Sequence, residues 1–217
     1  MCSIAVGGCT KSPQVPAATA PPVPTVVPLT VAQATKAALL VSDLPKGWEG
    51  GVAPDRTPTI GLPVTYDPAE CRVVRDPLRD GGTPATIIRG QYLLRAENPS
   101  DDKVVTEVIA SFPADQLPLV RDIAEVLPRC GVIARTLEGL TSKTFVRQLP
   151  VPGLRDGVVL RFGDADDPTL KSDSYTAFVA RGGTLLALRA GSDTFTTDAA
   201  FARFATTAVA RLDAVVG

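Results

Sequence analysis

The sequence predicts a single α+β domain: a largely antiparallel sheet with helices packed on it. Two runs in which residues of different polarity alternate with period two, 86–96 and 103–112, flank a turn-forming segment, which is the pattern of a β-hairpin. Further strand-like runs follow between 131 and 190, and the stretch 198–216 carries the apolar stripe of an amphipathic helix. The chain contains no internal repeat and no second linker, so we expect one sheet of about five to seven strands.

The folded part is expected to begin at Thr30. Thr30-Val31-Ala32-Gln33 has the spacing of a capping box, so a helix should run from there to about Val41. Pro45 then stops helical structure, and Gly47 supplies a turn. Trp48 is the only tryptophan and opens the first extended segment, where a lone large aromatic is more often a packing residue than a ligand contact.

A second extended piece is expected over Ile60–Tyr66, directly before a helix. Asp67 is the predicted N-cap of this helix, with Pro68 at the first helical position. Cys71 falls on the apolar face of the same helix, so its sulfur should point inward.

The next unit is the hairpin formed by 86–96 and 103–112. Asn98-Pro99-Ser100-Asp101-Asp102 lies between the two runs and has the composition of a turn. A helix is then expected over Pro113–Leu127, because apolar residues recur on one side of it. It leads directly to Cys130.

The second half should consist of strands followed by one helix. The expected strands are Gly131–Leu137, Lys143–Leu149, Val158–Phe162, Ser174–Arg181 and Thr184–Ala190. Gly182-Gly183 joins the last two as a tight turn, because glycine tolerates the positive φ of a primed turn. The final helix, Asp198–Val216, should lie on the sheet, which its apolar stripe needs as a partner.

Composition excludes several classes of function. The chain has no histidine, which removes Ser-His-Asp and Cys-His catalysis as well as histidine metal ligands. Its four cysteines include no C-x-x-C pair, so no zinc site is expected. A net charge of −1 gives no reason to expect nucleic acid as a partner. We expect no metal and no cofactor.

Two weaker chemical possibilities remain in the second half. The acidic segment Gly163–Pro168 could supply oxygen ligands to calcium, but it lacks the glycine and the distal glutamate of an EF-hand loop and favours a plain turn. Ser172 next to Lys171 is too little to indicate a Ser-Lys hydrolase, and no G-x-S-x-G elbow is present. We therefore expect a protein that is not an enzyme.

Cys71 and Cys130 are expected to form a disulfide that locks a helix–strand–strand–helix unit. An even pair of cysteines inside a domain fits an exported, oxidised protein or two buried thiols, and the N-terminal sequence favours the first. Such a bond would close a loop of roughly 60 residues, which the chain-entropy model values at up to ~4 kcal/mol.

The N-terminal sequence resembles an export signal. Residues 3–9 end in Val6-Gly7-Gly8-Cys9, which resembles the lipobox of a bacterial lipoprotein signal peptide with Cys9 as the lipidated residue. No basic residue precedes Cys9 and the apolar run is short, so we expect 1–9 to be a remnant of a signal whose true start lies upstream. The alternative is an ordinary terminus with two incidental cysteines.

Residues 10–29 are rich in proline and are expected to form a disordered tether. Twenty residues of extended polyproline geometry, at about 3.1 Å each, would reach roughly 60 Å. No later run of apolar residues is long enough to span a bilayer. A lipid on Cys9 would then be the only link to the membrane, and residues 30–217 would form the domain.

The order of these features resembles a known family. The signal-like start, the proline-rich tether, Asp43-Leu44-Pro45-Lys46-Gly47-Trp48, the helix led by Cys71 and the helix ending at Cys130 are together similar to actinobacterial exported lipoproteins related to the extracellular sensor domain of PknH-type receptor kinases. The resemblance covers about residues 30–217. It implies an extracytoplasmic α+β domain with a sheet-lined cleft that binds a ligand. That sensor domain has two internal disulfides, whereas this chain has cysteines for one.

Arginines and tyrosines inside the strands are the candidate ligand-binding residues. Tyr92, Arg161, Tyr175 and Arg189 would suit an anionic or glycan-like ligand if they point into a concave face; otherwise the arginines lie on a solvated face of the sheet. The predicted function is a cell-envelope lipoprotein with a non-catalytic, sensor-like domain that binds an unknown small molecule. The alternative is an envelope assembly lipoprotein that contacts another protein through a sheet edge or an apolar patch.

Overall fold

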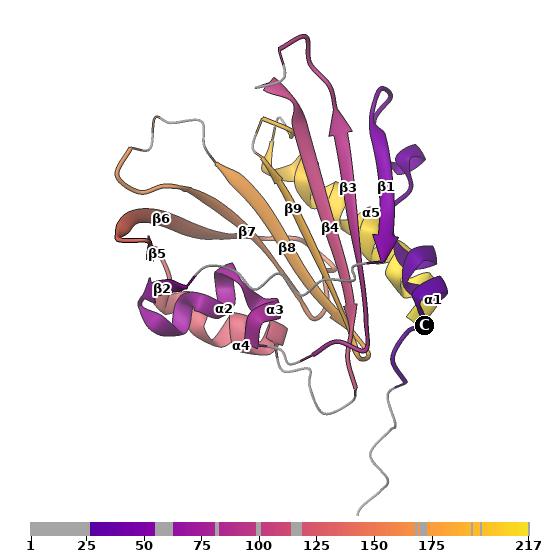
Figure 1. Cartoon of the computed structure of the whole chain (residues 1–217), viewed down its shortest axis with the longest axis horizontal. Coiled ribbons are helices and arrows are strands. Elements are labelled where there is room, and N and C mark those ends of the chain that lie inside the picture. Colours follow the sequence, from indigo (N-terminus) through magenta and orange to yellow (C-terminus); the bar gives the residue numbers. More distant parts are fainter. Residues whose placement is uncertain are drawn as a thin grey trace, which may run out of the picture.

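The structure is a computed structural model that describes residues 27–54, 63–80, 83–98, 101–113, 119–167, 169, 173–191, 193–195 and 197–216. Within these residues the strands form one sheet of nine, in the order β1-β3-β4-β9-β8-β7-β6-β5-β2 (Figure 1). Every neighbouring pair is antiparallel. The predicted α+β class is confirmed. The expected five to seven strands are too few, because even the short extended segments at the two edges pair into the ladder.

The strands are β1 (Glu49–Pro54), β2 (Val64–Asp67), β3 (Thr86–Leu94), β4 (Lys103–Ser111), β5 (Val132–Leu137), β6 (Leu140–Leu149), β7 (Gly157–Asp164), β8 (Ser174–Arg181) and β9 (Thr184–Gly191). The helices are α1 (Val31–Ala37), α2 (Arg72–Arg75), α3 (Pro77–Asp80), α4 (Leu119–Val126) and α5 (Asp198–Val216). Short 3₁₀ turns are η1 (Val41–Asp43), η2 (Ala69–Cys71) and η4 (Leu127–Arg129).

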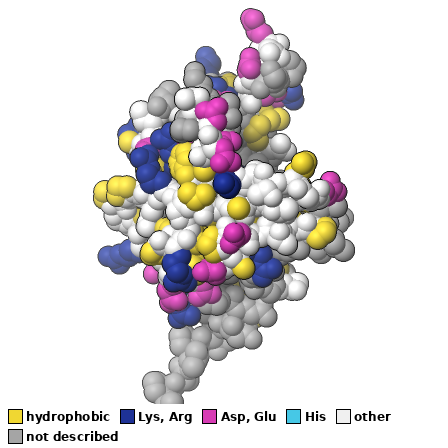
Figure 2. Space-filling view, turned by 90° about the vertical axis from the view of Figure 1, so that its left-hand side faces the viewer, with side chains coloured by type: hydrophobic (Ala, Val, Ile, Leu, Met, Phe, Trp, Pro, Cys, Tyr) yellow, Lys and Arg dark blue, Asp and Glu magenta, His cyan; other side chains and the backbone are white. Residues whose placement is uncertain are grey.

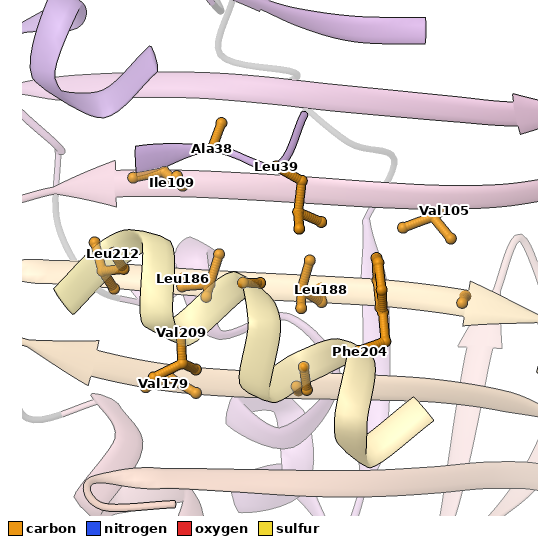
Figure 3. Packing of buried hydrophobic residues seen from close by; sticks show 14 of the residues in the cluster. Ala38, Leu39, Val105, Ile109, Val179, Leu186, Leu188, Phe204, Val209 and Leu212 are labelled. Carbon is orange, nitrogen blue, oxygen red and sulfur yellow. The ribbon is translucent and has the colours of Figure 1, made fainter. Parts of the chain in front are cut away.

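Helices lie on both faces of the sheet (Figure 1). We call the face under α1 and α5 the α5 face, and the face partly covered by α2, α3 and α4 the α4 face. On the α5 face, Val209 and Leu212 of α5 lie over the strands that carry Val179 and Leu186 (Figure 3). This apolar stripe is the partner that the final helix was expected to need.

The disulfide between Cys71 and Cys130 is confirmed and lies within the core of the α4 face. Their α-carbons are 5.7 Å apart, inside the range that a disulfide spans. Both cysteines are fully buried, in a cluster with Phe112, Ile123 and other apolar residues of α4 and the sheet. The bond joins the end of η2 to the residue after η4, so it ties the two short helical regions of this face together.

Helix boundaries are where the sequence predictions differ most from the structure. Asp67 is not an N-cap: it pairs with Ala134 in the β2–β5 ladder, and Pro68 remains extended at ψ 147°. The first helix ends at Ala37 rather than near Val41, because the N–H of Leu39 bonds Glu107 instead of continuing the helix. Of the helix expected over 113–127, residues 114–118 lie outside the described part of the chain.

Other elements match closely. β8 and α5 have the predicted bounds, and Gly182 adopts φ +53° in the turn between β8 and β9. The Thr30 capping box forms with Gln33, and Trp48 is buried in the core of the α5 face.

The described chain enters the sheet at one end. Just before α1, the backbone N–H of Leu29 donates to the Ser111 hydroxyl at 2.9 Å. That hydroxyl is also 3.0 Å from the hydroxyl of Thr184. The contact fixes the start of the domain at the ends of β4 and β9.

Candidate functional site

The four predicted ligand-binding residues do not lie together. Tyr92 and Tyr175 belong to the core of the α5 face, and Arg161 bonds Asp198 of α5 on the same face. Arg189 points to the opposite face, since it alternates along β9 with Leu188 and Ala190 of the α5-face core. Three of the four predicted residues therefore lie on the α5 face, and Arg189 lies on the α4 face.

Tyr92 is part of a buried polar ring with Glu107 and Leu39. Its hydroxyl donates to the Leu39 carbonyl at 2.6 Å and lies 3.2 Å from Oε2 of Glu107. The Leu39 N–H donates to the same Oε2 at 3.1 Å. Because Glu107 takes this N–H, the chain after Ala37 leaves the helix and runs extended over the sheet, which explains the early end of α1.

Glu107 titrates far from its ordinary range. Burial raises the pKa of this carboxyl to about 7, although the bonds from Leu39 and Tyr92 favour its charged form. When Glu107 is charged, its carboxylate and the Leu39 carbonyl share the single hydroxyl proton of Tyr92. When Glu107 is protonated, it can donate to the tyrosine oxygen and leave the Tyr92 proton to Leu39, so that every member of the ring is satisfied. Burial also raises the pKa of Tyr92, with Glu107 adding to it. The polar groups of Tyr92 and Glu107 thus bond other parts of the domain.

Sequence reasoning missed Glu107, although its position carried a signal. It alternates with Val105 and Ile109 on one side of β4, and all three are buried. A carboxylate on the buried side of a strand is rare unless it has a partner, and here the partner comes from the chain beyond α1.

Arg161 and Tyr175 belong to a second network at the start of α5. Arg161 donates to Asp173 through Nε at 2.7 Å and to Asp198 through Nη1 at 3.4 Å. Tyr175 donates to Asp198 at 2.8 Å, and its ring stacks on Phe201 with centroids 5.0 Å apart. The hydrogen bond to Asp173 raises the pKa of Arg161. Arg147 also donates to Asp198, at 2.8 Å, so two arginines face two aspartates and the charges in this network balance.

Arg189 has a different neighbour, Arg75, which follows Val74 at the end of α2. We call these two residues the arginine pair. Nη2 of Arg189 donates to the Arg75 carbonyl oxygen at 3.3 Å, and the Arg75 guanidinium lies 4.7 Å from the ring centre of Phe162. Among the described residues, no ion pair within 4.0 Å joins either guanidinium to a carboxylate.

The possible metal and hydrolytic sites of the second half can be compared with the described residues. They contain no group of three metal-ligating side chains. In the acidic loop, Oδ1 of Asp164 accepts the N–H groups of Asp166 and Asp167, both at 2.8 Å, which is the geometry of a plain turn. Cys9, Lys171 and Ser172 lie outside the described part of the chain.

The surface carries charges of both signs. Seen from the side of β5 and β6, Lys and Arg, Asp and Glu, and hydrophobic side chains lie interspersed (Figure 2). Among the helices described here, none is long and apolar enough to cross a membrane.

Comparison with known proteins gives a likeness of fold. Neither the protein-family models nor the curated proteins contain a match to this sequence. Among solved structures, the extracellular domain of PknH from Mycobacterium tuberculosis matches with a TM-score of 0.61 and 14% identity, over 88% of this chain and 98% of that one. An uncharacterized protein from Mycobacterium smegmatis matches at a TM-score of 0.45 and 15% identity, over 82% and 96%. The chain thus shares the fold of the PknH extracellular domain.

Proposed function

We propose that this protein is a cell-envelope lipoprotein whose domain is an extracytoplasmic, non-catalytic, sensor-like module that binds a ligand. Cys9 would carry the lipid, residues 10–29 would form the tether, and the domain would meet its ligand outside the cytoplasm.

The observation that carries this proposal is the buried disulfide inside a fold shared with an extracellular domain. Disulfides form and persist in oxidising compartments and are rare in the cytoplasm, and Cys71 and Cys130 are joined at the centre of the α4-face core. The fold shared with the PknH extracellular domain also supports an extracytoplasmic location. The lipobox-like Val6-Gly7-Gly8-Cys9 supports the lipid anchor.

Metabolic labelling tests the anchor. The gene, with its genomic upstream region, is expressed in an actinobacterial host that is fed an alkyne fatty acid, and the protein is then tested for label and for partition into detergent. We expect labelled protein in the membrane fraction, and we expect Cys9→Ser to lose the label while the matched variant Cys2→Ser keeps it. Label that survives Cys9→Ser, or unlabelled wild-type protein, would refute the lipoprotein assignment.

Thiol trapping in the same cells tests the compartment. Intact cells are treated with a membrane-impermeant thiol reagent, lysed in acid, and the mass of the Cys71 and Cys130 peptides is measured. An extracytoplasmic domain should yield these peptides joined and unmodified. Free thiols at both positions in freshly acid-quenched cells would place the domain in a reducing compartment.

A further inference from the structure

We propose that the arginine pair, with Thr176 beside it, is a binding site for an oxyanion, a carboxylate or phosphate group, on the α4 face. The inference rests on the proposed function in one respect: it names the class of ligand that the sensor-like domain would bind.

The register of the sheet places polar side chains in one row across four strands. Arg189 of β9 pairs with Thr106 of β4 on one side and with Thr176 of β8 on the other. Thr106 in turn pairs with Gln91 of β3. Directly paired residues in neighbouring antiparallel strands point to the same face, with Cβ atoms about 5 Å apart. The row therefore brings an amide, two hydroxyls and a guanidinium to one level of the α4 face.

Arg75 approaches this row from the end of α2. Its carbonyl oxygen accepts the hydrogen bond from Arg189, and its guanidinium stacks over Phe162 of β7, whose strand lies next to β8. Cation–π stacking on one side of a guanidinium leaves its N–H edge available to an acceptor.

The arginine pair is desolvated while remaining open to solvent. Desolvation lowers the pKa of Arg189, and Asp76 and Tyr66 only partly oppose it; desolvation also lowers the pKa of Arg75, with repulsion from Arg189 adding to it. Yet the Arg189 side chain is exposed. Arg75 is half-buried, so both guanidinium groups combine contact with the protein and access to solvent. In Figure 1 the helices of the α4 face cover only its lower part, below the upper halves of β4 and β9.

Thr176 provides a second, independent observation. The residue is 2% exposed, and within the described part of the chain its hydroxyl has no hydrogen-bond partner. A buried hydroxyl without a partner costs about 1–3 kcal/mol and calls for a physical explanation. A ligand oxygen held by the guanidinium of Arg189, the direct cross-strand neighbour, would give this hydroxyl its missing partner.

The charges specify the chemistry of the ligand. Guanidinium groups bind carboxylates and phosphates through pairs of parallel N–H bonds. Arg135 of β5 adds positive potential at Arg75, while Asp76 reduces it at Arg189. The site as a whole is therefore cationic, and threonine hydroxyls suit the same oxygen acceptors.

Titration calorimetry on the purified, oxidised chain tests the site. Inorganic phosphate is the first probe and acetate the second, each at low ionic strength, because surface electrostatics is weakened by salt. We expect saturable binding of at least one probe at millimolar concentration or tighter. Arg189→Gln and Arg75→Gln should each weaken that binding at least tenfold, and Thr176→Val should weaken it several-fold.

Arg147→Gln is the matched control, since it removes the same charge from an exposed arginine of the α5 face. It should leave probe binding unchanged. Binding of neither probe to wild-type protein, or equal weakening by Arg147→Gln and Arg189→Gln, would overturn the site. A preference for phosphate or for acetate decides which oxyanion the site selects. Because the experiment uses isolated protein, failure here leaves the labelling result on Cys9 standing, and failure of the labelling leaves this result standing.

Discussion

Strand arginines on the two faces of the sheet have different partners. On the α5 face, arginines meet carboxylates: Arg161 bonds Asp173 and Asp198, and Arg181 bonds Asp213 of α5. On the α4 face, the arginine pair instead meets a backbone carbonyl and an aromatic ring. The comparison shows that a charged strand residue is no sign of a binding site by itself. What distinguishes Arg189 from Arg161 is the lack of a described carboxylate partner within ion-pair distance.

The faces also differ in how their helices are held. α5 is long and lies along the sheet, so packing of its apolar stripe is sufficient. α2 and η4 are each at most four residues long, too short to be stable without help. On that face the disulfide ties these short segments together, whereas the 19 residues of α5 pack along the sheet.

Removing the disulfide should have the largest effect. Cys71→Ala with Cys130→Ala should lower the free energy of unfolding by about 4 kcal/mol, because the loop that the bond closes becomes free in the unfolded chain. Urea denaturation followed by tryptophan fluorescence measures it. The control is Cys2→Ala with Cys9→Ala, which should leave the midpoint unchanged. A loss below about 1 kcal/mol would mean that the α4 face is held by packing like its opposite.

Glu107 should make the α5 face sensitive to pH. Its pKa rises from 4.5 to about 7 on folding, so the fold favours the protonated form. The contribution is complete below pH 4.5 and is lost as the pH rises through 7, a total of about 3 kcal/mol.

Glu107→Gln tests this directly, because the amide keeps the ring with Tyr92 and Leu39 but cannot ionise. Its free energy of unfolding, measured in urea from pH 4 to 9, should equal that of the wild type at the acid end and exceed it by up to about 3 kcal/mol at the alkaline end. Parallel curves for the two proteins would show that Glu107 does not change its charge on folding.

Breaking the Asp43–Arg211 pair should have an intermediate effect. Nη2 of Arg211 donates to Asp43 at 3.0 Å, and the side chains are 26% and 17% exposed. Asp43→Asn should therefore cost about 1–2 kcal/mol at neutral pH. Burial opposes ionisation of Asp43, but the bond from Arg211, the bond from the Leu40 N–H and the charge of Arg211 together outweigh it and lower the pKa. The cost should therefore vanish as the pH falls through the pKa of Asp43. An equal cost at pH 2.5 would contradict the ion pair.

Arg147→Gln should have the smallest effect. Its bond to Asp198 at 2.8 Å is exposed, and Asp198 keeps Arg161 and Tyr175 as donors. We expect a change of no more than about 0.5 kcal/mol in thermal or urea unfolding. A larger loss would show that the networks of the α5 face depend on every member.

The sequence predicted the elements whose pattern is local. Ser174–Arg181 and Asp198–Val216 were bounded correctly because turn glycines and a continuous apolar stripe mark them in the chain itself. The disulfide was predicted because two cysteines lie at opposite ends of one unit, in a chain whose N-terminal sequence resembles an export signal. These signals need no knowledge of distant neighbours.

The remainder depended on contacts between distant residues. The end of α1 was misplaced because Glu107, 68 residues beyond Leu39, takes the N–H that a longer helix would use. Tyr92 and Arg189 were grouped although a strand's alternation sends them to opposite faces, which only the pairing order reveals. Arg75, in a helix thought to serve the disulfide, was not considered.

The contact between Leu29 and Ser111 has a consequence for orientation. Ser111 pairs with Thr184 at the level where the chain enters the sheet, whereas Arg189 pairs with Thr106 five positions further along the same ladder. At about 3.4 Å per residue, roughly 17 Å of strand separates the two levels. A force applied at the N-terminus would thus act where β4 ends and β9 begins. The arginine pair lies toward the opposite end of these two strands. A domain held at that end would present the arginine pair away from whatever holds it.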